Sequence, residues 1–235
     1  MTRDQDQTVV EHLTEFRHRF VSVCVCFALV FVASFFFAPQ VYAFLTSGFD
    51  QKLIVLGPDD ILWIYVQLSS IMAFTVSLPF MVYQIWAYVR PALEETSSRL
   101  VGIYILAIFL CFIGGLAFGF VFVTPNLLRV LLSLGQGLFE TQLTARNYLN
   151  FVLHTSLPLA LIFEMPVLVA FLTSLSILSP TFLVNYRRYA YFILLVLAVV
   201  LTPADFISDL AMTLPLIGIY EISLLVSRII SRKKK

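Results

Sequence analysis

The sequence predicts an all-α integral membrane protein with six transmembrane helices. Of its 235 residues 60% are hydrophobic and 12% are charged, whereas about 25% of the residues in a soluble domain are charged. The hydrophobic residues gather in runs that approach or exceed the roughly 20 residues that cross a bilayer. No polar segment is long enough to build a soluble core, so we expect one membrane domain over residues 1–235.

The expected elements follow from helical spacing and from the prolines and glycines that interrupt it. Residues 8–19 place apolar and charged side chains on opposite sides, which predicts a short N-terminal amphipathic helix. The loop after the third span should hold a partly buried surface helix. We expect the six spans at about residues 20–38, 66–89, 100–123, 148–175, 189–201 and 206–230.

Prolines and length should affect four of these spans. The second lies in a charge-free run that is longer than a span needs, so it should tilt, protrude or kink at Pro79. The fourth contains Pro158 and Pro166, which free backbone carbonyls and bend the helix. Helices 5 and 6 should be short, which would put the turn at Asp205 below the outer lipid surface.

The distribution of Lys and Arg predicts the orientation of the chain in the membrane. Six spans place both termini on one side. All but three of the 15 Lys and Arg residues fall on that side, the exceptions being Lys52, Arg129 and Arg146. Because basic residues collect in cytoplasmic loops, we expect both termini to be cytoplasmic. The acidic N-terminus and the absence of a small-residue cleavage site argue against a cleavable signal peptide.

Glu164 stands out within the fourth predicted span. It is the only charged residue between Arg146 and Arg187. An ionised, unpaired carboxylate in the membrane costs on the order of 2–3 kcal/mol or more. We therefore expect the neutral form, either as a structural hydrogen bond to a neighbouring helix or as a functional group.

The sequence contains no set of residues that indicates catalysis. It lacks a Gly-x-Ser-x-Gly elbow, an HExxH helix and a P-loop. Cys24, Cys26 and Cys111 lie in apolar runs and form neither a disulfide framework nor a zinc pattern. We expect no enzyme, no cofactor, no metal site and no nucleic-acid partner.

Two glycines in the third span predict a close helix contact. Gly115 and Gly119 form a small-xxx-small pair, which lets two helix backbones approach. The partner could be another helix of this chain or another subunit.

Carboxylates on the cytoplasmic side admit two interpretations. Glu15 can form a solvated i,i+4 pair with Arg19, which contributes little. Together with Glu94 and Glu95, it can instead receive a cationic ligand, since guanidinium groups pair bidentately with carboxylates. A hydrophobic stretch after the arginines of such a ligand would suit the adjoining apolar surface.

Five segments resemble motifs of one family, in the same order and over nearly the whole chain. That family is TatC, the multispanning receptor of the twin-arginine translocase. The segments are His12–Arg19 (HLTEFRHR), Tyr83–Leu93 (YQIWAYVRPAL), Phe163–Val167 (FEMPV), Arg187–Tyr189 (RRY) and Leu201–Asp205 (LTPAD).

The resemblance implies a receptor for twin-arginine signal peptides within a translocase that exports folded proteins with the proton-motive force. It implies single-span partners of the TatA/TatB type, an oligomeric complex in contact with lipid, and a bacterial plasma membrane. The implied signal-peptide-binding residues are Glu15, Arg17, Tyr88, Pro91, Glu94 and Glu95. The implied residues for partner contact and translocation are Glu164, Pro166, Pro203 and Asp205.

One departure from the family affects the binding set. The first cytoplasmic loop of the family usually carries a glutamate directly before basic residues, and here the matching position is Ser97. Glu94 or Glu95, slightly earlier, is the candidate to take its place.

Two other classes of function remain as alternatives. A proton-coupled small-solute transporter could use Glu164 as a proton relay, although the two halves show no internal repeat of the kind common in such folds. An intramembrane enzyme would need a nucleophile and a base, and no such pair is evident.

Overall fold

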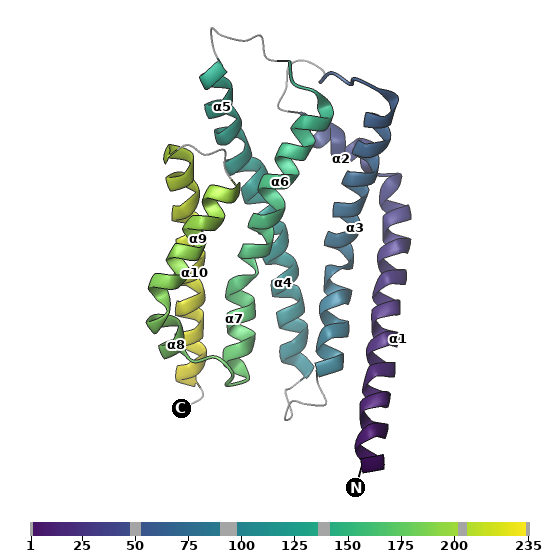
Figure 1. Cartoon of the computed structure of the whole chain (residues 1–235), viewed down its shortest axis with the longest axis vertical. Coiled ribbons are helices and arrows are strands. Elements are labelled where there is room, and N and C mark those ends of the chain that lie inside the picture. Colours follow the sequence, from purple (N-terminus) through teal and green to yellow (C-terminus); the bar gives the residue numbers. More distant parts are fainter. Residues whose placement is uncertain (1, 48–52, 90–97, 136–141, 202–205, 234–235) are drawn as a thin grey trace. The chain divides into compact units, whose positions relative to one another are not determined.

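The computed structural model describes residues 2–47, 53–89, 98–135, 142–201 and 206–233, and every element within these ranges is helical (Figure 1). The elements are α1 (Thr2–Phe35), α2 (Ala38–Leu45), α3 (Pro58–Val89), α4 (Ser98–Phe118), the π-helical η2 (Gly119–Val123), α5 (Thr124–Gly135), α6 (Ala145–Phe163), α7 (Met165–Ser174), α8 (Pro180–Asn185), α9 (Arg187–Leu201) and α10 (Phe206–Lys233).

The residue contacts divide the chain into two compact units. The N-terminal unit comprises residues 1–109 and the C-terminal unit residues 110–235. The boundary falls within α4.

Within the described residues, five helical stretches are long and apolar enough to cross a membrane. They are Leu13–Leu45, Pro58–Tyr88, Gly102–Ser133, Ala145–Ser174 and Met212–Arg232. The predicted fifth span is present as α9, whose 15 residues extend about 22 Å at 1.5 Å per residue. The all-helical membrane fold is confirmed, whereas the count of six spans stays a prediction.

One expected boundary and one expected helix length are wrong. The separate amphipathic helix over residues 8–19 is wrong, because these residues are the first turns of the continuous 34-residue α1. No proline or glycine interrupts that stretch, so its i→i−4 hydrogen bonds have no reason to stop. The last helix lies where it was expected, since α10 begins at Phe206, but it is not short, because it runs for 28 residues through Pro215 into the basic tail.

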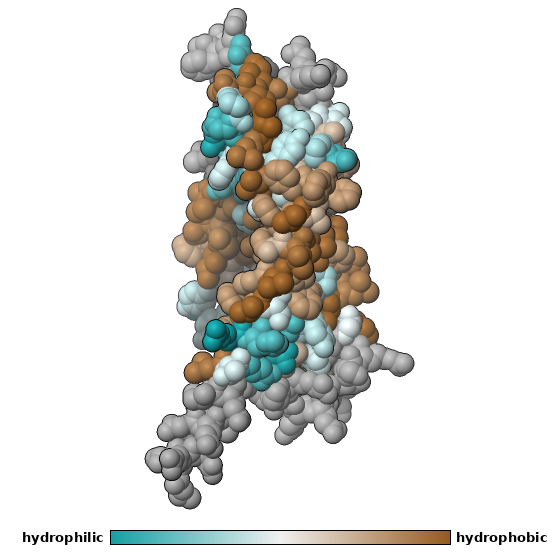
Figure 2. Space-filling model, turned by 90° about the vertical axis from the view of Figure 1, so that its right-hand side faces the viewer, coloured by the Kyte–Doolittle hydropathy of each residue, from teal (hydrophilic) through white to brown (hydrophobic). Residues whose placement is uncertain are grey.

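In the N-terminal unit, α1 packs along α3. The ring centroids of Phe35 and Tyr65 lie 5.5 Å apart, and Leu68 and Ala73 of α3 are buried. α3 continues through Pro79 without a break. The face over α1 is mostly hydrophobic, with polar side chains towards its ends (Figure 2). Such a surface suits contact with lipid.

In the C-terminal unit, α4 continues through η2 into α5 without a loop. The backbone N–H of Thr124 donates to the carbonyl of Gly119, five residues earlier. Pro125, which follows, has no N–H for the usual bond to the carbonyl four residues before it. The widened turn absorbs this loss. The helix expected after the third span is present as α5, with Leu127 buried, but it continues that span without a loop, and its location at the membrane surface stays a prediction.

The glycine pair of the third span packs inside the chain, against α6. A Cβ atom added to Gly115 would lie 2.5 Å from the Cα of Ala160, and one added to Gly119 would lie 2.6 Å from the Cα of Ser156. Two small-xxx-small pairs thus face each other in antiparallel register. Of the two partners that the sequence left open for these glycines, the structure therefore shows a helix of the same chain.

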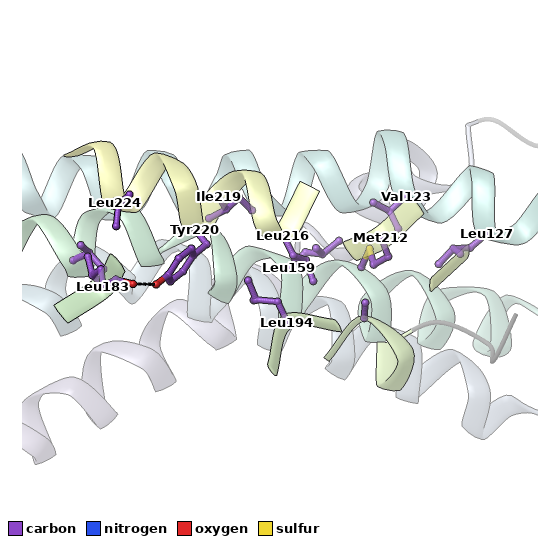
Figure 3. Close-up of a cluster of buried hydrophobic side chains, with 12 residues drawn as sticks. Val123, Leu127, Leu159, Leu183, Leu194, Met212, Leu216, Ile219, Tyr220 and Leu224 are labelled. Carbon is purple, nitrogen blue, oxygen red and sulfur yellow. Dashed lines mark hydrogen bonds between the residues drawn. The ribbon is translucent and has the colours of Figure 1, made fainter. Parts of the chain in front are cut away.

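The buried core of the C-terminal unit surrounds α10, which contacts α6, α7, α8 and α9. Leu216 lies at its middle, near Leu159 and Leu194 (Figure 3). The hydroxyl of Tyr220 donates to the carbonyl of Leu183 over 2.7 Å (Figure 3). The hydroxyls of Thr173 on α7 and Ser227 on α10 share a hydrogen bond of 2.8 Å.

Replacing Gly115 by Ala should destabilise the protein, because the new Cβ would collide with backbone on α6. We expect the free energy of unfolding to fall by about 1–3 kcal/mol, the usual cost of overpacking. Gly114→Ala is the matched control, since nothing lies within 4 Å of its added Cβ. Alanine in an open helical position should stabilise by about 0.5–1 kcal/mol. Unfolding of the purified protein in detergent measures both, and equal stability of the two variants would refute the close contact.

Candidate functional site

Glu15, the first predicted ligand-binding carboxylate, is part of a polar network between α1 and α3. Its Oε1 accepts hydrogen bonds from Nε and NH2 of Arg19, at 2.9 and 2.6 Å. NH1 of Arg19 donates to Oε1 of Gln84 over 3.0 Å. The side chains of Glu15 and Arg19 are 36% and 26% exposed. The i,i+4 pair is therefore present, and Arg19 also ties α1 to α3.

An apolar pocket adjoins this network at the surface of the N-terminal unit. Its volume is about 360 Å³, and its accessible wall is apolar. Phe16 and Tyr88 meet there edge to face with centroids 5.6 Å apart. The residues that line it are Phe16, Arg19, Phe20, Val23, Met81, Gln84, Ile85 and Tyr88. The arrangement offers a carboxylate beside a recess for an apolar side chain.

The other predicted signal-peptide residues divide into two groups. Tyr88 lines the pocket, and Arg17 is exposed on α1. Pro91, Glu94 and Glu95 lie outside the described residues, as does Ser97.

Glu164 lies at the break between α6 and α7 and is buried, with 7% of its surface exposed. Its backbone carbonyl accepts hydrogen bonds from the N–H groups of Val167 and Leu168, at 3.1 and 3.0 Å. Pro166 supplies no N–H at the start of α7, which is a position that tolerates proline. The predicted bend of this span is thus confirmed, and Glu164 occupies the bend.

Neither carboxylate oxygen of Glu164 has a hydrogen-bond partner among the described residues. The expected structural hydrogen bond to a neighbouring helix is therefore not found in this part of the chain. Buried polar groups normally have partners, so an unsatisfied carboxyl group is a candidate for an external partner or for water.

Small and polar residues extend from Glu164 along the contact between α4, η2 and α6. Gly119 faces Ser156 and Gly115 faces Ala160. One more turn in this register places Cys111 next to Glu164. The hydroxyl of Ser156 is buried and also has no hydrogen-bond partner in the described ranges. The contact therefore combines close packing with polar groups that the described chain leaves unsatisfied.

Two further predicted residues cannot be placed. Pro203 and Asp205 lie outside the described residues. The prediction that their turn lies below the outer lipid surface therefore stays a prediction.

Sequence reasoning missed an ion-pair network between α9 and α10. NH2 of Arg187 donates to Oε2 of Glu221 over 2.8 Å, and the hydroxyl of Tyr191 donates to its Oε1 over 2.5 Å. Glu221 is the only acidic residue after Asp209, which could have marked it as the partner of a cation. Sequence reasoning had assigned Arg187 only to the orientation of the chain.

Within the described ranges, no group of three or more His, Cys, Asp or Glu side chains could hold a metal ion.

The comparisons with known proteins agree on one family. The sequence model described as "Sec-independent protein translocase protein (TatC)" matches residues 11–215. The chain is 39% identical over 232 residues to Sec-independent protein translocase protein TatCd of Bacillus subtilis (strain 168), covering 98% of this chain and 96% of that protein. It is 30% identical to TatC of Aquifex aeolicus (strain VF5), covering 97% of each.

Two solved structures resemble the fold closely. A crystal structure of the twin arginine translocase receptor TatC matches with a TM-score of 0.78 and 28% identity, over 94% of this chain and 99% of that one. A second, of the receptor in DDM, matches with a TM-score of 0.79 and 30% identity, over 92% and 99%.

Glu164→Gln should leave stability almost unchanged, because the described chain offers neither oxygen a partner to lose. We expect a change below about 1 kcal/mol in the free energy of unfolding. Glu221→Gln is the matched control, because it weakens two interactions that are present in the structure. The partly exposed ion pair with Arg187 contributes about 1 kcal/mol at most, and the hydrogen bond from Tyr191 contributes in addition. Detergent unfolding at neutral pH compares the two. A loss of about 3 kcal/mol for Glu164→Gln, typical of a broken buried ion pair, would contradict the unpaired state.

Proposed function

Because this chain belongs to the TatC family of Sec-independent translocase proteins, we propose that it is the receptor for twin-arginine signal peptides in such a translocase. It is a component of protein transport and not an enzyme. The substrates in this proposal are folded precursor proteins, and the proton-motive force drives their export.

The observation that supports the receptor role best is a partly exposed carboxylate beside an apolar pocket. Glu15 supplies the negative charge, and its Oε2 has no hydrogen bond within the described residues. The aromatic wall of Phe16 and Tyr88 adjoins it. A peptide with an arginine followed by apolar residues would satisfy both features, since charge-assisted hydrogen bonds and apolar burial then act together. Arg17, Pro91, Glu94 and Glu95 complete the proposed binding set.

The partner role rests on Glu164 and its neighbours. A single-span helix of the TatA/TatB type could satisfy the buried carboxyl group from outside the chain, because hydrogen bonds between helices stabilise association within a membrane. Pro166 fixes the bend that presents Glu164, and we assign Pro203 and Asp205 to the same surface on the resemblance alone. We propose that receptor and partners form an oligomeric complex in contact with lipid.

The topology belongs to the same proposal. We infer six spans in a single membrane domain, with α9 as the short fifth span and both termini in the cytoplasm of a bacterium. In the C-terminal unit, α8 precedes Arg187 and Arg188 and lies at the same end as the C-terminus of α10, which carries Arg228 and Arg232 (Figure 1). Basic residues at one end support a cytoplasmic location of that end. No observation on the described residues supports the alternative of a small-solute transporter.

Glu15→Gln should weaken binding of a twin-arginine signal peptide by about tenfold, because it removes the charge from a charge-assisted hydrogen bond. A peptide with two lysines in place of the arginines should lose less, since lysine cannot form the bidentate contact. Binding of labelled peptides to the protein in lipid nanodiscs measures both.

Glu11→Gln is the control for the peptide experiment, because it removes a carboxylate one turn earlier on α1. It should change binding by less than about threefold, because a charge without a direct hydrogen bond to the ligand contributes only a Coulomb energy that water weakens. Equal losses for Glu11→Gln and Glu15→Gln, or equal losses for the two peptides, would refute the assigned role of Glu15.

A photoreactive amino acid at position 164 should crosslink to a single-span partner protein in membranes that contain both. Position 29 is the control, because Leu29 is 68% exposed on α1 and should face lipid. Crosslinked products are separated by mass. Equal yields at the two positions would argue against a docking role for the surface around Glu164.

A further inference from the structure

We propose that the end of the C-terminal unit where α9 begins and α10 ends binds the headgroup of an anionic phospholipid. Arg188 and Arg228 supply the positive charge, and a row of aromatic rings on α8 and α9 holds this end at the membrane interface. The inference requires that α10 crosses a membrane, as its length and composition allow. It does not depend on the proposed receptor role.

Three half-exposed aromatic rings follow one another across the turn between α8 and α9. The ring centroids of Phe182 and Tyr186 lie 4.4 Å apart, and those of Tyr186 and Tyr189 lie 6.0 Å apart. The backbone N–H of Tyr186 donates to the carbonyl of Phe182, so the chain stays helical up to the turn. Tyrosine has an apolar ring with a polar tip and collects at the level of lipid headgroups. The row therefore indicates that this end lies at the membrane interface.

Arg188 lies over the last ring of this row. Its Cζ is 4.9 Å from the centroid of the Tyr189 ring, and its NH2 donates to the hydroxyl of Tyr189 over 3.2 Å. The ring attracts the guanidinium through its quadrupole. The side chain is exposed, and arginine carries five N–H donors. A phosphate can therefore bind to Arg188 while Tyr189 keeps its hydrogen bond.

α10 brings a second cation to the same end. Leu183 of α8 and Leu224 of α10 belong to one buried cluster, and they lie at the same level along α10 (Figure 3). Arg228 follows Leu224 by four residues, so it lies one turn further on the same face of α10. Its side chain is exposed. Arg228 is therefore placed beside α8 and the turn that carries the aromatic row.

The charge at this end is one-sided. Glu221 is the only acidic residue after Asp209, and Arg187 already pairs with it over 2.8 Å. Within the described ranges, neither Arg188 nor Arg228 has an ion pair with an acidic side chain. Exposed cations without a local counter-charge attract anions.

A lipid fits this surface better than a free phosphate ion does. Basic residues near the surface of a membrane attract anionic lipids, which supply the phosphate that the arginines can bind. The half-exposed rings of Phe182 and Tyr186 also offer apolar surface, which an acyl chain covers and an inorganic ion does not. Charge and apolar surface are thus satisfied by one molecule.

Native mass spectrometry of the full chain in detergent measures the Kd of the first bound lipid, with phosphatidylglycerol and phosphatidylcholine titrated separately. We expect phosphatidylglycerol to bind at least about tenfold more tightly, because the choline group neutralises the phosphate of the other lipid. Arg188→Gln and Arg228→Gln should each weaken binding of phosphatidylglycerol by about fivefold, the effect of one basic residue near an anionic surface. Each should weaken binding of phosphatidylcholine by less than about twofold.

Arg129→Gln is the matched control, because it removes the same charge from the same unit. Arg129 is exposed on α5, which lies at the opposite end of the C-terminal unit from α8 (Figure 1). It should change binding of phosphatidylglycerol by less than about twofold. An equal loss for Arg129→Gln and Arg188→Gln would overturn the inference, since only the net charge of the chain would then matter.

Two further variants separate charge from geometry at Arg188. Arg188→Lys keeps the charge and should weaken binding of phosphatidylglycerol by no more than about twofold. Tyr189→Leu removes the ring beneath the guanidinium and should weaken it by about threefold. Helical circular dichroism verifies that each variant is folded, and Arg188→Lys provides the comparison if Arg188→Gln is not.

A photoreactive amino acid at position 182 identifies the occupant in native membranes. We expect a crosslinked product whose added mass is that of an anionic phospholipid. A product that contains a second protein in place of a lipid would overturn the inference, because an acidic segment of a partner would then occupy the site. Equal Kd values for the two lipids would overturn it as well, and so would unchanged binding of phosphatidylglycerol in both Arg188→Gln and Arg228→Gln.

Discussion

The structure depends on one constraint: the interior of a bilayer offers no water to satisfy backbone N–H and C=O groups. Every described element is accordingly a helix. The same constraint decides where the backbone can depart from α-helical geometry. Within the expected third and fourth spans the described chain departs from α-helical geometry at η2 and at the turn at Glu164, and both pack on other helices of the C-terminal unit. A proline follows each one closely, and this residue lacks the backbone N–H that a regular helical turn would use.

Both departures help to shape the proposed partner site. The widened turn of η2 ends the stretch in which Gly115 and Gly119 bring the backbone of α4 and η2 against α6. The turn at Glu164 ends α6 itself, so the carboxyl group sits where the continuous helix stops. Close packing leaves no space for a large side chain along this contact. The polar groups within it therefore remain without partners in the described chain, which is the condition for recruiting one from outside.

The sequence predicted the helices and their approximate bounds well, because hydrophobic runs and breakers specify them locally. It predicted the glycine contact only as one of two alternatives, since spacing cannot identify the partner helix. It failed to predict that the first helix is continuous. Nothing in residues 8–19 distinguishes the start of a long helix from a separate amphipathic one. The bond between Arg19 and Gln84 was also out of reach, because it joins residues 65 positions apart.

Glu15 and Glu164 show how access to water changes the use of the same side chain. Glu15 is partly exposed, so an arginine of the same helix can hold it at little cost and release it to a competing guanidinium. Glu164 is buried, and a resident cation there would have required desolvation of two charges, which an ion pair often fails to offset. The neutral form that the sequence predicts for this carboxyl group would avoid that cost and could still accept or donate a hydrogen bond. The partly exposed Glu15 therefore suits recognition of a charged ligand, whereas the buried Glu164 suits a contact between helices.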